Sequence, residues 1–263
     1  MKIVKIACDT VDPTRIFGDR VENYAKYRPT YSPQAIQFIV NKLVQNQSLE
    51  VADIGSGTGI FTGLLLNEGL RVCAVEPNGE MRQAAELALA NNPRFRSVHG
   101  KAEQTMLPDH SIGTITAAQA FHWFDIEKAR SEFQRILVPD GNVVLVWNTR
   151  RQGDGAFHDS YEGIVEKYAT RPRAKPIEDG SHRHPSQDRF FGVERYECEE
   201  FSHSTELDLA ALLGLYDSIS YSPKKGTPSH DAARRELTDS FSKYAANGVV
   251  SIEYLTQVFF GRL

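Results

Sequence analysis

The sequence predicts an α/β protein built on a doubly wound, mostly parallel sheet of seven strands, with a helical lid inserted late in the chain. Strand-like apolar runs alternate five times with amphipathic helical stretches between residues 33 and 148. That alternation is typical of a parallel sheet with helices on both faces. A glycine-rich turn, DIGSGTG at residues 53–59, follows the first apolar run, where such sheets bind ligands.

The expected elements follow from periodicity and from helix-end signals. Ser32 and Pro33 suit an N-cap and a first helical residue, and apolar side chains then recur at helical spacing. After Asn148 the alternation ends, and two late strands are expected to complete the sheet. We expect helices at 33–46, 59–67, 79–91, 125–137, 157–169, 206–217 and 230–245, and strands at 49–54, 71–77, 95–100, 112–120, 143–148, 193–204 and 249–263.

Composition limits the class of protein. The 263 residues include 30 Lys and Arg against 34 Asp and Glu, for a net charge of -4, so we expect neither nucleic acid nor an anionic membrane as a partner. Cys8, Cys73 and Cys198 lie far apart and indicate neither a disulfide framework nor a zinc site. The opening stretch is too short and polar for a secretory signal, and no apolar run reaches the ~18 residues of a membrane span. We therefore expect a cytoplasmic protein.

The glycine turn favours an adenosine ligand without phosphates. Glu76 ends the second strand, 21 residues after Gly55, where a carboxylate can accept hydrogen bonds from ribose hydroxyls. A dinucleotide turn needs the pattern G-x-G-x-x-G. Ile60 stands at the third glycine position counted from Gly55, and Thr62 stands there counted from Gly57. We therefore expect the glycines to admit a ligand to the backbone, but not a pyrophosphate.

The motifs around this turn resemble those of class I S-adenosylmethionine-dependent methyltransferases. They are VADIGSGTG, VCAVEP and GKAEQTMLPDHSIGTITAAQAFHWFD, and the resemblance covers about residues 20–148. AQAFHWFD together with the upstream VENYAKYRPTYS is most similar to the small-molecule branch that includes trans-aconitate methyltransferase. The resemblance implies a Rossmann-like fold with S-adenosyl-L-methionine as cofactor.

The resemblance also implies roles for the residues of the turn. Gly55, Ser56 and Gly57 would face the amino-acid part of the cofactor. Asp53 would hold its ammonium group, directly or through water. Glu76 would bind the ribose hydroxyls, with a surface role as the alternative.

Further cofactor contacts are implied after the later strands. Pro77 follows the ribose carboxylate, and Met81 would pack on the adenine, although a purely core role suits a methionine equally well. Ala102 and Glu103 would meet the amino edge of the adenine. Gln119, at the end of the fourth strand, would lie beside the sulfonium.

The implied organisation has three parts. Residues 1–32 would close over the cofactor, with Tyr24 covering it and Arg28 pairing with its carboxylate or forming a surface ion pair. Residues 33–149 and 192–263 would form the methyltransferase core with its late strands. Residues 150–191 and 204–247 would supply the helical lid.

His122 is the candidate catalytic residue. A base is needed only if the acceptor arrives protonated, as a phenol or an enol does and a carboxylate does not. A histidine followed by Trp123 and Phe124 can equally be a packed structural residue. A working base would make turnover rise with pH through a pKa near ~6.5, moved by its surroundings.

The acceptor is expected to be a small organic molecule methylated on oxygen, a carboxylate being one candidate. The fourth strand ends in AAQAF, without the motifs of base, pyrimidine, arginine or catechol methylation. Tyr161, Tyr216 and Tyr221 in the lid would shape its pocket. We expect no metal site and a monomer or homodimer. A methyltransferase that reaches protein or RNA through a partner subunit, and a cofactor-binding protein without turnover, remain open.

Overall fold

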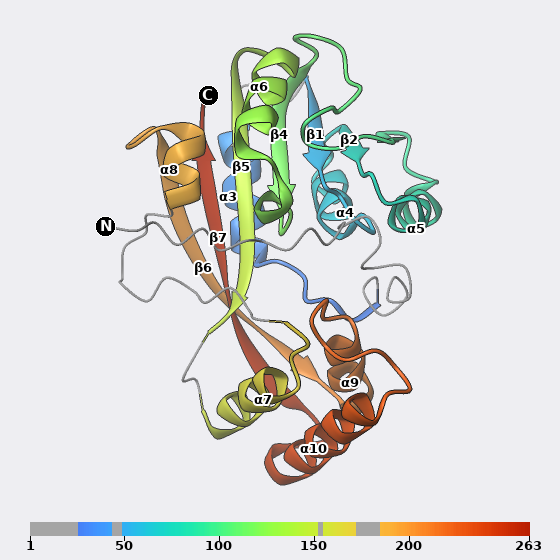
Figure 1. Ribbon diagram of the computed structural model, residues 1–263. Helices are drawn as coiled ribbons and strands as arrows, with labels where there is room; N and C mark the ends of the chain where they lie inside the picture. The colour runs from blue at the N-terminus through green and yellow to red at the C-terminus, as the bar shows by residue number, and fades with distance from the viewer. Residues whose placement is uncertain (1–25, 44–48, 152–154, 172–184) are drawn as a thin grey trace, which may run out of the picture.

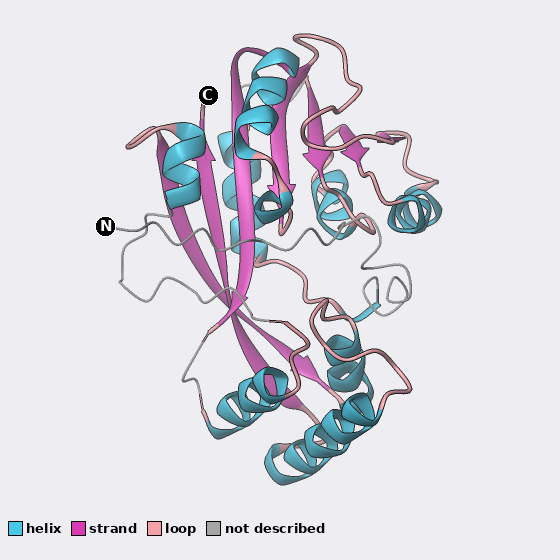
Figure 2. Cartoon of the chain, in the orientation of Figure 1, coloured by secondary structure: helices cyan, strands magenta, loops and turns pink. Residues whose placement is uncertain are grey.

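A seven-stranded sheet organises the protein, and a computed structural model describes residues 26–43, 49–151, 155–171 and 185–263 of it (Figure 1). The strand order is β3-β2-β1-β4-β5-β7-β6. Neighbours from β3 to β5 pair in parallel, and β7 runs antiparallel to both β5 and β6 (Figure 2). The expected doubly wound, mostly parallel seven-stranded sheet is confirmed.

Most elements begin and end within a few residues of the expected positions. The strands are β1 (Glu50–Ile54), β2 (Val72–Val75), β3 (Phe95–Val98), β4 (Ile112–Ala118), β5 (Leu137–Arg150), β6 (Tyr196–Leu207) and β7 (Val250–Gly261). The α-helices are α3 (Pro33–Lys42), α4 (Ile60–Asn67), α5 (Gly79–Leu89), α6 (Ile126–Ile136), α7 (Ala156–Lys167), α8 (Pro185–Phe191), α9 (Leu209–Asp217) and α10 (Pro228–Tyr244), and a 3₁₀ turn, η3, spans Phe121–Trp123.

Local chemistry explains several of these ends. Asn78 and Asp125 accept a hydrogen bond from a backbone N–H in the first turns of α5 and α6, as N-cap side chains do. Ser32 holds the N-cap position of α3, but its hydroxyl donates to Gln34 Oε1 at 2.8 Å and makes no cap. The strand expected at 143–148 begins earlier, because β5 includes residues 137–142, and within this stretch Asp140 adopts a φ of 62°.

Two apolar layers cover the sheet. On one face, Ile39 of α3 and Leu65 of α4 are fully buried with Val144 of β5. On the other face, Phe133 of α6 and Phe190 of α8 are fully buried with residues of β1, β2, β4 and β5. Because β1 lies centrally with β2 on one side and β4 on the other, strand order reverses there. A ligand is expected beyond the carboxyl ends of these two strands.

The end of β6 and the start of β7 extend beyond the other strands of the sheet, into a second cluster of helices. Leu207 of β6 and Ile252 of β7 are buried among α7, α9 and α10, which form the lower part of the molecule in Figure 1. We call this unit the helical lobe. The expected lid range 150–191 also contains α8, but α8 packs in the core of the sheet because Phe190 and Phe191 insert there. None of the helices in the described ranges is long and apolar enough to cross a membrane.

Candidate functional site

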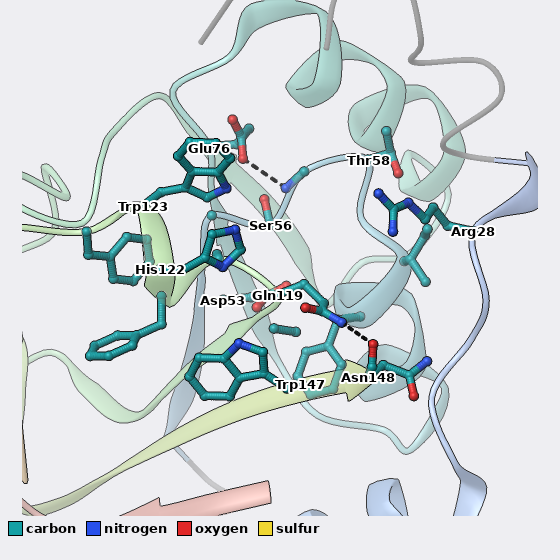
Figure 3. Close-up of a pocket in the computed structure, with 18 of the residues that line it drawn as sticks. Arg28, Asp53, Ser56, Thr58, Glu76, Gln119, His122, Trp123, Trp147 and Asn148 are labelled. Atoms are coloured by element: carbon teal, nitrogen blue, oxygen red, sulfur yellow. Dashed lines mark hydrogen bonds between the residues drawn. The ribbon is translucent and has the colours of Figure 1, made fainter. Parts of the chain in front are cut away.

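A cavity of about 880 Å³ opens at the carboxyl ends of β1 and β4 (Figure 3). Its volume falls in the range of small-molecule sites, roughly 300–1,000 Å³. The cavity reaches from the glycine turn to Leu215 and Tyr254 of the helical lobe. Tyr24 lies outside the described residues. The other expected site residues all line the cavity: Arg28, Asp53, Gly55, Ser56, Gly57, Glu76, Pro77, Met81, Ala102, Glu103, Gln119 and His122.

The three glycines of the turn have different neighbours, although each has a positive φ. A Cβ on Gly55 would lie 2.6 Å from Cβ of Ala120, and one on Gly59 would lie 3.0 Å from Cβ of Ala85. Among the described residues, a Cβ on Gly57 would come within 4 Å only of Sδ of Met81, at 3.8 Å. Gly55 and Gly57 line the cavity, and Gly59 is not among its described lining residues, so close approach of a ligand to the backbone stays a prediction for Gly55 and Gly57. Gly55 and Gly59 permit close packing of protein on protein, and Gly57 leaves the space beside Met81.

Glu76 is buried and braces the turn. Its Oε2 accepts a hydrogen bond from the backbone N–H of Gly57 at 2.9 Å (Figure 3). Its Oε1 accepts one from the backbone N–H of Asn78 at 2.7 Å. Burial raises the pKa of this carboxyl group, and the two backbone hydrogen bonds oppose that shift. Each carboxylate oxygen has a further acceptor position, so the group can also bind hydroxyls of a ligand in the cavity.

Asp53 lies at the end of β1 with almost no exposed surface. Its Oδ2 accepts a hydrogen bond from Thr62 at 2.6 Å and its Oδ1 accepts one from Thr116 at 3.0 Å. Burial raises the pKa of Asp53 to about 6, although both hydroxyls act to lower it. A cation in the cavity would favour the ionised carboxylate, which is the chemistry expected for an ammonium partner.

Two hydroxyl groups in the turn suit a polar ligand. Ser56 Oγ and Thr58 Oγ1 are buried and have no hydrogen-bond partner among the described residues. Both residues line the cavity. Since buried hydroxyls in proteins nearly always find a partner, this arrangement fits a ligand that hydrogen-bonds to the turn.

The three expected adenine contacts all line the cavity. Met81 is buried, and its backbone N–H is held by the side chain of Asn78 at 2.9 Å. Ala102 is also buried, and Glu103 Oε1 accepts a hydrogen bond from the backbone N–H of Asp125 at 2.8 Å. The Glu103 carboxylate thus already fixes the start of α6 while facing the cavity.

Gln119 connects β4 to the N-terminal segment. It adopts a φ of 56°, and its Nε2 donates to the carbonyl of Asn148 at 2.6 Å (Figure 3). The Asn148 side chain in turn donates to the carbonyl of Thr30 at 2.9 Å. These bonds hold the described part of the segment, including Arg28, against the mouth of the cavity.

His122 lies in η3 with its ring on the cavity wall. The side chain is exposed, and it lines the cavity. Desolvation by the surrounding protein atoms, together with the nearby Arg171 and Arg28, lowers the pKa of His122 to about 4. The imidazole is therefore neutral at pH 7, and the expected titration near ~6.5 is displaced by more than two pH units.

The sequence analysis missed residues that also line or support the cavity. Thr62 and Thr116 hold Asp53, and Trp147, Arg150 and Tyr254 line the wall. Arg150 could have been found from the sequence, because it is a charged residue that ends an apolar strand. Three tyrosines of the lid were expected to shape the acceptor pocket, but the described lining of the cavity contains none of them: Tyr161, Tyr216 and Tyr221. It contains Tyr254 of β7. Tyr161 and Tyr216 instead pack inside the helical lobe.

Comparison with known proteins identifies the class. A family profile described as a methyltransferase domain matches residues 52–145. An uncharacterised methyltransferase of Mycobacterium tuberculosis (strain H37Rv) is 32% identical over 255 residues, covering 95% of this chain and 97% of that protein. One of Schizosaccharomyces pombe is 28% identical over 137 residues, covering 52% of this chain and 53% of its own. The chain belongs to the class I S-adenosylmethionine-dependent methyltransferases. It is an enzyme whose cofactor is S-adenosyl-L-methionine.

Solved structures share the fold. A candidate type II methyltransferase of Anaeromyxobacter dehalogenans aligns with a TM-score of 0.68 at 21% identity, covering 90% of this chain and 98% of that chain. Phosphoethanolamine N-methyltransferase 2 of Haemonchus contortus, solved in complex with S-adenosyl-L-methionine, aligns with a TM-score of 0.51 at 16% identity. That alignment covers 96% of this chain and 60% of the other. These similarities confirm the Rossmann-like methyltransferase architecture.

Proposed function

We propose that the enzyme methylates an oxygen of a small organic acceptor bound between the glycine turn and the helical lobe. The observation that carries the proposal is one cavity lined both by the expected cofactor residues and by Leu215 and Tyr254 of the lobe. A space of about 880 Å³ suits a cofactor with a small molecule beside it. The proposal includes a cytoplasmic location, no nucleic-acid partner and a monomer or homodimer.

The residues of the turn would hold the cofactor, which supplies a methyl group on a sulfonium. Gly57 offers space at the backbone, Ser56 Oγ offers a hydrogen bond, and Asp53 offers an anion for the ammonium. Glu76 would bind the ribose, Met81 the adenine and Arg28 the carboxylate. The described part of the N-terminal segment would help to cover the bound cofactor.

The aromatic residues around η3 would exclude water and align the acceptor. The ring of Phe121 lies edge-on to Trp147, with centroids 5.9 Å apart, and edge-on to Phe124 at 5.8 Å. All three residues line the cavity. Alignment of the nucleophile and removal of water are the main requirements for methyl transfer from so good a leaving group.

Transfer of a labelled methyl group tests the acceptor class. The enzyme is incubated with methyl-labelled cofactor and, separately, with the small-molecule, protein and RNA fractions of a cell extract. We expect label in the small-molecule fraction, in a product whose methyl group is bonded to oxygen. Label confined to protein or RNA, or an N-methyl product, would contradict the proposal. Tight cofactor binding without transfer to any fraction would indicate a binding protein.

Replacing His122 tests its part in the reaction. A neutral imidazole beside the acceptor can take a proton from a hydroxyl group, so His122→Asn should lower kcat about 10²-fold if the acceptor arrives protonated. Because the pKa of His122 lies at about 4, the base is already deprotonated above pH 6. Turnover of the wild type should therefore be flat from pH 6 to 9 and should fall as pH drops towards 4.

The pH profile of the His122→Asn variant distinguishes a general base from a residue that only aligns the acceptor. A base role predicts that the acid-side fall in turnover disappears in His122→Asn, with little change in cofactor affinity. Near-normal kcat in the variant would remove His122 from proton transfer and leave alignment as the mechanism.

A further inference from the structure

A charged polar cluster lies where the cavity meets the helical lobe. Arg150 ends β5 and is directly opposite Tyr254 in the β5–β7 register. The guanidinium forms an ion pair with Glu162 through Nε and donates from Nη2 to the hydroxyl of Tyr221 at 3.3 Å. It also lies 5.3 Å from the centroid of the Tyr161 ring. Arg150 is therefore fixed in place by groups of the lobe.

This cluster retains hydrogen-bond donors beside the cavity. Arg150 and Tyr254 both line it. The described residues accept no hydrogen bond from Nη1 of Arg150, whose other bonds use Nε and Nη2. The Tyr254 hydroxyl is buried, in a residue 2% exposed, and it has no partner in the described part of the chain. A buried tyrosine hydroxyl ordinarily finds a partner. A ligand in the cavity can supply one here.

The charge of the cluster favours an anion. Burial would lower the pKa of Arg150, but the surrounding tyrosines and Glu162 keep it well above its usual value, so the guanidinium stays charged. Burial raises the pKa of Tyr254 to about 12, although Arg150 and Arg28 act to lower it, so the phenol remains a neutral donor at pH 7. Two donors, one of them cationic, thus belong to neighbouring residues that both line the cavity.

We propose that Arg150 and Tyr254 bind a carboxylate of the acceptor that is not the group methylated. A guanidinium N–H and a phenol O–H match the two oxygens of a carboxylate. A carboxylate held by an arginine has its charge neutralised and is a weak nucleophile, so it anchors the molecule. The accepting oxygen then lies towards Gln119 and His122. This inference rests on the proposed small-molecule function.

Two tyrosine variants separate binding from packing. Tyr254→Phe removes only a hydroxyl that has no partner among the described residues, so the melting temperature of this variant should equal or exceed that of the wild type. Tyr161→Phe is the matched control, because the Tyr161 hydroxyl is also buried without a partner among the described residues but does not line the cavity. Arg150→Lys keeps the charge opposite Glu162 and loses the forked geometry.

Binding is measured by calorimetry with the cofactor site saturated by S-adenosylhomocysteine. The probes are malonate, succinate, glutarate, adipate and benzoate, each compared with its neutral amide. We expect at least one acid to bind and its amide not to bind. Tyr254→Phe and Arg150→Lys should each raise the dissociation constant of that acid about tenfold or more, the scale of a hydrogen bond to a charged group. Tyr161→Phe should leave the dissociation constant unchanged.

Each result decides between defined alternatives. Equal binding of acid and amide, no binding by any acid, or an unchanged Kd in Tyr254→Phe would overturn the carboxylate site. These results would leave methylation on oxygen standing, since the labelled-methyl experiment tests it separately. Conversely, an N-methyl product alongside intact acid binding would overturn the proposed function and leave the anion site.

Discussion

Gly55→Ala is expected to destabilise the protein by roughly 2–5 kcal/mol, through overpacking and a left-handed backbone. The added Cβ would meet Cβ of Ala120 at 2.6 Å, and φ at this position is +70°. Ala120 directly precedes η3, so neither side of the contact can move without shifting the cavity wall. Denaturant unfolding of the wild type and the variant measures the difference in free energy.

Gly57→Ala is the matched control for that result. Its φ is +57°, but among the described residues its Cβ would meet only Sδ of Met81, at 3.8 Å, so backbone strain of about 1–2 kcal/mol is expected without a clash. This variant should fold and should bind S-adenosylhomocysteine much more weakly, because the methyl group enters the cavity beside the turn. Equal stability of the two variants would contradict the assignment of Gly55 to packing. Normal affinity in Gly57→Ala would contradict a ligand at Gly57.

Glu76→Ala is expected to weaken binding of S-adenosylhomocysteine by about 10- to 150-fold, equivalent to roughly 1.5–3 kcal/mol for hydrogen bonds to a charged group. The carboxylate would bind the ribose hydroxyls and already orients the N–H of Gly57. Calorimetric titration gives the dissociation constant.

Glu76→Gln controls for the bracing of the turn. The amide retains one oxygen for a backbone N–H but cannot accept at both ends, so its affinity should lie between those of the wild type and Glu76→Ala. The melting temperature of each unliganded variant shows how much of the loss comes from the turn itself. An unchanged dissociation constant in Glu76→Ala would remove Glu76 from the ribose site.

The core of the fold could be predicted because its signals are local. Apolar runs alternating with helices define β1 to β5, and the turn residues mark where the ligand must lie. The positions of Glu76 and Gln119 could be predicted because each residue directly follows a parallel strand, and the carboxyl ends of these strands meet at one edge of the sheet. The position of a strand end can be predicted without knowing which distant residues pack against it.

Other features depend on contacts between segments far apart in the chain. The role of Gly55 depends on Ala120, and the low pKa of His122 depends on desolvation by the surrounding protein atoms with Arg171 and Arg28 nearby. The pairing of Arg150 with Tyr254 requires the antiparallel register of β5 and β7. Periodicity within one segment carries none of this information, so these features become visible only in the folded chain.

Competition between two ligands tests the central claim, that the DIGSGTG turn binds a nucleoside cofactor without a pyrophosphate. Calorimetric titration of the wild type with S-adenosylhomocysteine should show saturable binding, and prior addition of excess NADH should leave the dissociation constant unchanged. The same titration should show strongly reduced affinity in Gly57→Ala. Saturable binding of NADH that displaces S-adenosylhomocysteine, or no binding of S-adenosylhomocysteine at all, would contradict the account.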